Sequence, residues 1–349
     1  MNVSTHAPRS EGLFEVVGAR AALNYFGALG PDGLSHGYLF TGPAGVGKKT
    51  FARALAQSLL CETPKATLLG YCNRCPGCTL FRAGTHPDFV ASEGTVKIGK
   101  EPGSAQHDEE LTARDLVREL SLRGYRSDHR VVLLGDVDFA THEAANALLK
   151  FFEEPPRGVV VLLTSSAPGT LPETIRSRFV EIGFAPLTLA EVESVLRAGG
   201  VDAARAKAAA EASFGSITRA RAVLEGAGEG IRAAAFGWFA DAMLGREPDH
   251  SFLQLDDRSL SAADKRALVA EMLEIVRIAA RDWATLGVAA DAPLLAPDQR
   301  ALLARIPMRP LPDVAALLGA IAETSRLAET NVSAGLVVDY LRMQLALAG

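Results

Sequence analysis

A glycine-rich segment has the residue types and spacing of a phosphate-binding loop. It fits the pattern G-x-x-x-x-G-K and runs Gly42-Pro43-Ala44-Gly45-Val46-Gly47-Lys48. In such a loop, backbone N–H groups surround an anion, the next helix directs its positive end at the phosphates, and the lysine reaches terminal phosphate oxygens. A tight turn between a strand and a helix is the alternative. The register of the glycines with Lys48 favours phosphate binding.

The residues that would hold a metal ion beside this loop are replaced. The position after Lys48 normally carries Ser or Thr, whose hydroxyl binds Mg²⁺, but here it is Lys49. Thr50 comes one residue late, which turns its side chain about 100° around the helix. The second metal support, an Asp at the end of a hydrophobic strand, is replaced by Gly135-Asp136. We therefore expect weak or no binding of ATP or ADP, and little or no hydrolysis.

All cysteines of the chain lie close together, in the spacing C-x10-C-x2-C-x2-C. Two-residue gaps let successive thiolates converge on one ion, and the first cysteine supplies a fourth corner from the end of a helix. The pattern predicts a closed, structural Zn²⁺ site. Free thiols, a disulfide pair and an iron–sulfur cluster are the alternatives. The predicted ligands are Cys61, Cys72, Cys75 and Cys78.

Four further sites have residue types that could act on a phosphate or a metal. Arg178 follows a strand; such an arginine is a surface cation or reaches a phosphate bound by a neighbouring subunit. Ser165 and Ser166 could sense a γ-phosphate, although serines at strand ends are usually turn formers. Arg219 could face nucleotide or be a solvated helix charge. His86 could replace a cysteine ligand, but the sequence around it is more typical of a turn.

Alternating strands and helices are expected to position these residues in the first half of the chain. A short strand at 37–41 precedes the phosphate loop and a helix at 48–60 follows it. The β-branched runs at 131–135 and 159–164 are typical of strands buried on both faces, and a helix at 141–153 separates them. Strands separated by helices predict an α/β fold with a parallel sheet.

The remaining segments are expected to be irregular or helical. Residues 61–110, rich in Cys, Gly and Pro, are expected to form an irregular insertion, and no strand pattern follows Pro186. Further helices are expected at 14–30, 111–124, 188–198, 202–213 and 216–225, with more in 231–349. These patterns divide the chain into three domains, 1–185, 186–228 and 229–349.

Composition restricts the class of protein. The chain has 349 residues and a net charge of −5, which argues against a strongly basic nucleic-acid binder. No apolar run reaches the 18 or so residues of a membrane span, and the first residues lack the core of a signal peptide. A cytoplasmic protein without membrane contact is the expectation.

The combination of motifs resembles the AAA+ clamp-loader proteins of bacterial DNA polymerase III. The phosphate loop with Lys48-Lys49 and the four-cysteine module carry the resemblance. So do His36 to Gly42, Gly84-Thr85-His86-Pro87-Asp88, Ala144-Ala145-Asn146-Ala147-Leu148-Leu149-Lys150 with Glu153-Glu154-Pro155-Pro156, and Ile175-Arg176-Ser177-Arg178. Asn331 to Leu336 is a weaker match near the carboxyl end.

The resemblance implies an architecture and a set of partners. It implies an AAA+ module with a zinc module inserted at about 61–90, a helical lid, and a C-terminal domain in the collar of a five-subunit ring. The family contains an ATP-hydrolysing motor, the gamma/tau type, and a non-motor delta-prime type; Lys49 and Gly135-Asp136 favour the latter. The implied partners are the gamma/tau and delta subunits, the sliding clamp and, through the complex, primed DNA.

For Arg178 the resemblance implies a trans arginine finger that acts on the ATP of the adjacent motor subunit. The family's usual Ser-Arg-Cys is Ser177-Arg178-Phe179 here, which affects packing rather than the functional atom. Two alternatives remain: an active motor subunit that recruits Thr50 for Mg²⁺, and a small-molecule kinase. The long helical tail, with no second substrate motif, disfavours the kinase.

Overall fold

The chain forms two compact units, residues 1–191 and 192–349. The computed structural model describes residues 16–30, 33–63, 67–93, 126–137, 151–153, 155–225, 229–328 and 332–347. The boundaries at 185/186 and 228/229 stay predictions.

A five-stranded parallel sheet forms the centre of the N-terminal unit. Its order is β2-β3-β4-β1-β5, so β1 lies between β4 and β5, with Thr41 opposite both Ser165 and Gly183. The predicted parallel α/β fold is confirmed. The strands are β1 (Gly37–Thr41), β2 (Phe89–Glu93), β3 (Arg130–Gly135), β4 (Val159–Ser165) and β5 (Val180–Gly183).

The expectation that residues 61–110 are irregular was wrong at two places. Residues 89–93 form strand β2 at the edge of the sheet, and residues 76–82 form a helix. Edge strands carry a weak sequence signal because they need fewer apolar residues than central ones. Pairing with β3, which no local pattern encodes, makes residues 89–93 a strand.

Short helices flank the sheet. The predicted helix 14–30 is confirmed only in part: α1 begins at Arg20, because Gly18 has a left-handed φ of +80° that a helix does not accommodate. The predicted helix 111–124 and most of 141–153 lie outside the described residues, although 151–153 are helical. The helices are α1 (Arg20–Ala28), α2 (Lys48–Leu59), α3 (Pro76–Arg82), η4 (Pro168–Thr170) and α6 (Glu173–Arg176).

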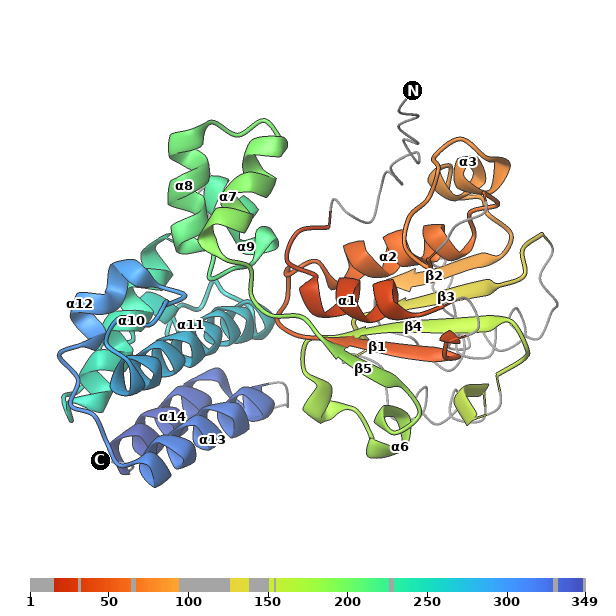
Figure 1. Cartoon of the computed structure of the whole chain (residues 1–349). Coiled ribbons are helices and arrows are strands. Elements are labelled where there is room, and N and C mark those ends of the chain that lie inside the picture. Colours follow the sequence, from red (N-terminus) through yellow and green to blue (C-terminus); the bar gives the residue numbers. More distant parts are fainter. Residues whose placement is uncertain are drawn as a thin grey trace. The chain divides into compact units, whose positions relative to one another are not determined.

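Apolar side chains cover both faces of the sheet. Tyr38 and Phe40 of β1 pack with α1 and α2 on one face, whereas Leu39 belongs to a second cluster with Phe152 and Phe179. Figure 1 shows α1 and α2 on one side of the sheet and α6 on the other. Alternate strand residues thus enter two separate cores, as the continuous apolar runs predicted.

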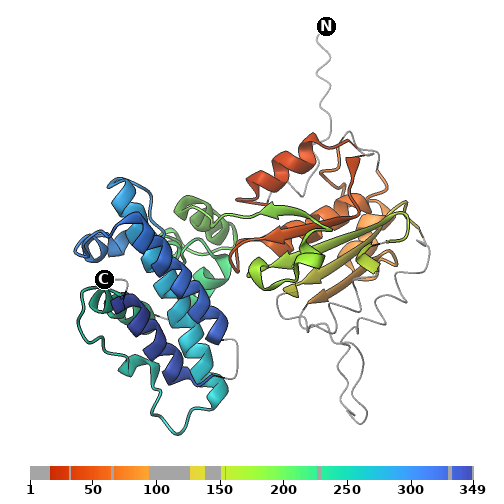
Figure 2. The same cartoon turned by 90° about the horizontal axis from the view of Figure 1, so that it is seen from below.

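The described part of the C-terminal unit contains helices and no strand. The three short helices predicted after Pro186 are confirmed to within one residue. Figure 2 shows α11, α13 and α14 running alongside one another. The helices are α7 (Leu189–Ala198, which starts before the boundary of the unit), α8 (Ala203–Ala212), α9 (Ile217–Leu224), α10 (Glu229–Met243), η5 (Ser251–Leu253), α11 (Ala262–Val288), η6 (Pro297–Gln299), α12 (Arg300–Leu303), α13 (Leu311–Ala328) and α14 (Ala334–Leu347).

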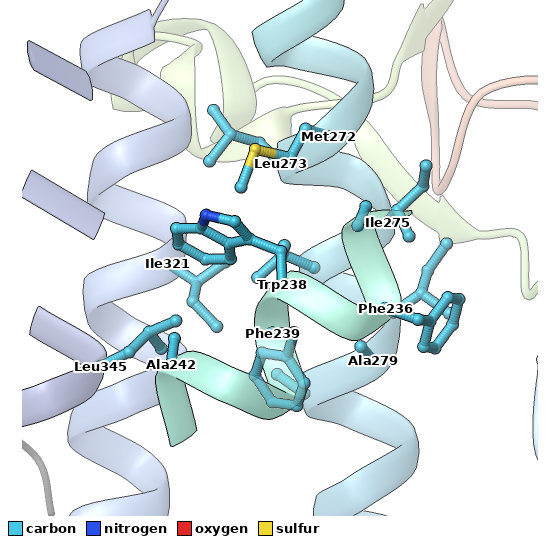
Figure 3. Close-up of a cluster of buried hydrophobic side chains, with 14 of the residues drawn as sticks. Phe236, Trp238, Phe239, Ala242, Met272, Leu273, Ile275, Ala279, Ile321 and Leu345 are labelled. Atoms are coloured by element: carbon cyan, nitrogen blue, oxygen red, sulfur yellow. The ribbon is translucent and has the colours of Figure 1, made fainter. Parts of the chain in front are cut away.

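Aromatic side chains of α10 occupy the core of this unit. Phe236, Trp238 and Phe239 are almost completely buried and pack against residues of α11, α13 and α14 (Figure 3). The chain's other tryptophan, Trp283, is buried in the same cluster. Among the helices that the structure describes, none combines the length and apolar content that a membrane span requires.

Candidate functional site

The glycine-rich segment lies between β1 and α2, the strand–loop–helix context of a phosphate loop. Gly42 has a φ of +136°, and a Cβ at this position would collide with the carbonyl oxygen of Phe184. Gly47, with a φ of +98°, is the N-cap of α2 and provides no side-chain cap. The amino end of α2, with its exposed N–H groups and its positive dipole end, therefore follows the glycine loop without a side-chain cap from Gly47, as in loops that bind anions. Within the loop, Val46 is buried and Ala44 is exposed.

Lys48 connects the loop to the end of the neighbouring strand. Its side chain is buried, and Nζ donates to the carbonyl oxygens of Gly42 (2.5 Å) and Pro43 (2.8 Å) and to Ser166 Oγ (3.0 Å). Ser166 follows β4, so the carboxyl ends of two adjacent parallel strands meet here. Ser165, the other serine singled out from the sequence, is buried and paired with Thr41 in the sheet.

The two residues that stand in place of the usual metal ligands contact each other. Lys49 Nζ lies 2.5 Å from Asp136 Oδ2, and about a third of each side chain is exposed. Gly135 makes room for this pair, because a Cβ there would lie 2.8 Å from Lys49 Cε. Asp136 has a left-handed φ of 52°, and its N–H donates to Thr164 Oγ1 at 2.9 Å. Sequence reasoning missed Thr164, a buried strand residue with no motif to mark it.

Thr50, the alternative metal ligand, is exposed on α2. The loop therefore combines an anion-binding backbone with an ammonium–carboxylate pair at the place where Mg²⁺-dependent loops carry their metal supports.

The four cysteine sulfurs form one cluster, as predicted. All Sγ atoms lie within 4.8 Å of one another, with Cys61 Sγ and Cys75 Sγ 4.0 Å apart, and none of the four forms a disulfide. Tetrahedral Zn²⁺ with Zn–S bonds of about 2.3 Å requires sulfur–sulfur distances of about 3.8 Å. The sulfurs thus need to move only slightly to hold one ion.

Backbone N–H groups already point at two of the sulfurs. The N–H of Cys75 donates to Cys72 Sγ (3.3 Å) and that of Cys78 donates to Cys75 Sγ (3.4 Å). Burial raises the pKa of Cys72, but hydrogen bonds from Thr63 and from backbone N–H groups outweigh it and lower this pKa to about 6. Burial and the neighbouring Cys75 raise the pKa of Cys78 to about 12. A bound cation is needed for all four to be thiolates near neutral pH.

His86 lies in a turn beside this module and outside the four-sulfur cluster. Its Nδ1 accepts from the N–H of Asp88 at 3.1 Å, and burial lowers its pKa. The fully buried carboxylate of Asp88 accepts from the N–H groups of Arg126 and Ser127, both at 2.9 Å. This turn attaches the cysteine module to the segment that enters β3.

Arg178 and the phosphate loop lie at opposite ends of the strands. It comes two residues before β5, at the strand's amino end, whereas the loop follows the carboxyl end of the parallel neighbour β1. The paired part of β1 and β5 is three residue steps long, which separates the two ends by about 10 Å. The Arg178 guanidinium pairs with Glu153 Oε1 (2.5 Å, from Nη2) and donates from Nη1 to the carbonyl oxygen of Thr174. It is therefore not part of its own loop's site.

Arg219 is engaged within the C-terminal unit. Its guanidinium lies 5.0 Å from the ring centroid of Phe214 and 3.9 Å from a Glu271 oxygen, and burial lowers its pKa. Arg232 contacts the same ring at 5.1 Å and binds Asp298 through both terminal nitrogens, at 2.8 and 2.6 Å. The Arg219 side chain is thus only 21% exposed and is held by contacts within its own unit, so it is not a fully solvated helix charge.

Comparison with known proteins matches the part of the chain that carries these features. The family model described as DNA polymerase III, delta subunit, matches residues 22–188. This range contains the phosphate loop, the four cysteines and Arg178.

Several curated proteins are similar over this region. The DNA polymerase III subunit delta' of Pseudomonas aeruginosa is 40% identical over 148 residues, 42% of either chain. The delta' subunit of Bacillus subtilis is 34% identical over 173 residues, 49% of this chain and 48% of that one. The tau subunit of Escherichia coli is 30% identical over 189 residues, 54% of this chain and 28% of tau. The chain thus spans half or less of the length of these relatives.

Proposed function

We propose that this chain, whose residues 22–188 belong to the AAA+ clamp-loader family of DNA polymerase III delta-prime subunits, is a delta-prime-like subunit of the replicative clamp loader. It would assemble with gamma/tau and delta subunits and help them load the sliding clamp onto primed DNA.

Its proposed role in the complex is that of a non-motor subunit. The observation that carries this role is the ion pair between Lys49 and Asp136. An ammonium group beside the loop repels Mg²⁺, and the carboxylate that could attract the ion is already neutralised. The chain would hold the geometry of the ring and would hydrolyse little or no ATP itself.

The proposed contribution to catalysis comes from Arg178, acting on the ATP of an adjacent motor subunit. Its place at the edge of the sheet opposite its own phosphate loop supports action in trans. Guanidinium groups suit this role because they are permanently charged and present several N–H donors in one plane.

A structural Zn²⁺ ion is proposed for the four-cysteine cluster. The convergence of the sulfurs and the N–H donors aimed at two of them support it. Four cysteine thiolates would fill all four positions around a tetrahedral ion, so the site would be closed and its role would be to stabilise the insertion.

An ATPase assay on the isolated chain tests the non-motor role. We expect turnover no faster than that of the Lys48→Ala variant, with or without Mg²⁺. The active-motor alternative, in which Thr50 binds Mg²⁺, predicts appreciable turnover that Lys48→Ala abolishes. That result would refute the non-motor proposal.

Membership of the complex is tested by mixing the purified chain with gamma/tau and delta subunits. We expect one stable assembly on size exclusion, and clamp loading on primed DNA that requires this chain. Failure to assemble would contradict the clamp-loader proposal, whatever the ATPase result.

A further inference from the structure

Two neighbouring side chains contact the turn that carries Arg178. Glu153 Oε1 lies 2.5 Å from Arg178 Nη2. The preceding residue, Phe152, contacts the following one, Phe179, edge to face, with ring centroids 5.0 Å apart and planes at 84°. Consecutive residues of one segment thus contact consecutive residues of the other, one pair polar and one apolar.

The apolar pair packs the turn into the core of the sheet. Phe152 and Phe179 are both buried, in the core on the α6 side of the sheet. The Phe179 ring also lies over Gly37 of β1, where a Cβ would come within 2.7 Å of it. Phe179 replaces the cysteine of the family's usual Ser-Arg-Cys, and Phe152 and Gly37 enclose the larger ring. This packing fixes the backbone from which Arg178 extends.

The polar contacts fix the guanidinium itself. Nη2 donates to Glu153 and Nη1 donates to the carbonyl oxygen of Thr174, so each terminal nitrogen has one protein acceptor. A guanidinium has five N–H donors in one plane. Two acceptors therefore define that plane and leave three N–H groups for an external anion.

We infer that Glu153 is the positioning residue of Arg178, orienting its guanidinium towards the triphosphate bound by the adjacent motor subunit. The inference rests on the proposed finger role of Arg178. Glu153 need not touch the nucleotide, because it acts by reducing the number of orientations that Arg178 samples before the phosphate arrives.

The ion pair between Glu153 and Arg178 contributes little to the stability of the fold. The Glu153 side chain is 49% exposed and that of Arg178 is 29% exposed, so water screens their attraction. Removing the Glu153 carboxylate should therefore leave the thermal unfolding midpoint of the isolated chain unchanged within about 2 °C. A loss of activity without a loss of stability separates positioning from support of the fold.

The test is single-turnover ATP hydrolysis by the complex reconstituted with gamma/tau and delta subunits, clamp and primed DNA. Arg178→Ala should slow hydrolysis at the adjacent site by about 10³-fold, the lower end of what an arginine finger contributes. Glu153→Ala should slow it by about tenfold, the rate equivalent of one hydrogen bond to a charged group, with the ATP concentration that gives half the maximal rate unchanged. Glu153→Gln, which keeps an acceptor oxygen, should recover the rate to within about threefold.

The matched control is Glu181→Ala. It removes the neighbouring Arg176–Glu181 pair, 3.1 Å long and similarly exposed, without touching Arg178, and should leave the rate unchanged. In the Arg178→Ala background, Glu153→Ala should have no further effect.

The outcomes distinguish the positioning role of Glu153 from the finger role of Arg178. An unchanged rate for Arg178→Ala would overturn the finger role and the inference with it. Slow ATP hydrolysis with Arg178→Ala, together with a normal rate for Glu153→Ala, would overturn the inference about Glu153 and leave the finger role intact. So would a Glu153→Ala effect that persists without Arg178, or one that Glu181→Ala reproduces.

Discussion

Lys49 Nζ and Asp136 Oδ2 lie 2.5 Å apart at the carboxyl edge of the sheet. In the sequence they are two separate departures from a metal-binding phosphate loop. In the structure they form one ion pair, and Gly135 belongs with them because any side chain there would meet Lys49. Lys49, Gly135 and Asp136, which replace the usual metal ligands, are thus sterically and electrostatically complementary to one another.

This fit predicts that one substitution will not restore metal-dependent nucleotide binding. Lys49→Thr restores a hydroxyl but leaves Gly135 without a carboxylate. Adding Gly135→Asp places a carboxylate towards the space that the lysine vacates, because the Cβ of residue 135 points at Lys49. We expect ATP affinity in Mg²⁺ to rise on the order of tenfold in the double variant only, measured by calorimetry.

The same titration with EDTA is the control for this double variant, and should return the affinity to that of the unmodified chain. An equal gain in Lys49→Thr alone would show that Gly135 plays no part.

The cysteine cluster predicts one zinc ion per chain. Metal analysis should find about one equivalent in the purified protein, and none in the double variant Cys72→Ser/Cys75→Ser. Chelation should destabilise the insertion, because the free energy of metal binding contributes to its folding. His86→Gln is the matched control: it lies outside the four-sulfur cluster and should retain the ion. Loss of zinc in that variant would instead make His86 a ligand.

The contact between β1 and Phe179 predicts that Gly37 does not tolerate a larger residue. Gly37→Ala would place its Cβ 2.7 Å from the ring, and the buried ring has little room to move. We expect a loss of about 1–3 kcal/mol in the free energy of unfolding, followed by circular dichroism in urea.

Gly183→Ala, in the adjacent strand β5, is the control for that overpacking. A Cβ at 183 meets nothing within 4 Å, so its effect should stay within about 0.5 kcal/mol. Similar effects for the two variants would contradict the packing argument.

The Arg232–Asp298 pair predicts an acid-sensitive contribution to the C-terminal unit. Burial raises the pKa of Asp298, but hydrogen bonds from Arg232 and Gln299 outweigh it and hold this pKa below its ordinary value. A lowered folded-state pKa means that the stabilisation is present above the unfolded value, near 3.9, and is lost as the pH falls through the folded one. Asp298→Asn should therefore cost about 1 kcal/mol at pH 7, and less as the pH falls below about 4.

Tryptophan fluorescence follows the unfolding of the C-terminal unit and so measures its stability at each pH. The two tryptophans of the chain, Trp238 and Trp283, are both buried in the core of this unit. Asp241→Asn, which removes an exposed pair with Arg246 at 3.4 Å, is the control and should change stability by less than about 0.5 kcal/mol. A cost for Asp298→Asn that is the same at pH 7 and pH 3 would contradict the linkage.

Local spacing was enough to predict the phosphate loop and the cysteine cluster. Gly42 to Lys48 follow one strand and begin one helix, and the four cysteines lie within 18 residues, so chain geometry alone brings their atoms together. The buried strands were predictable for the same reason, since the continuous β-branched runs at 131–135 and 159–164 encode burial on both faces locally.

Only the tertiary structure decided which distant residues meet. Lys48 contacts Ser166, 118 residues away, because β1 and β4 are neighbours in the sheet. The strand order likewise sets Lys49 against Asp136. The parallel direction of β5 relative to β1 places Arg178 at the end of the strands away from its own loop. Strand order arises from crossover connections that juxtapose segments without any matching pattern in either one. The residue types show which chemistry is available, and the order of the strands decides which of these residues act together.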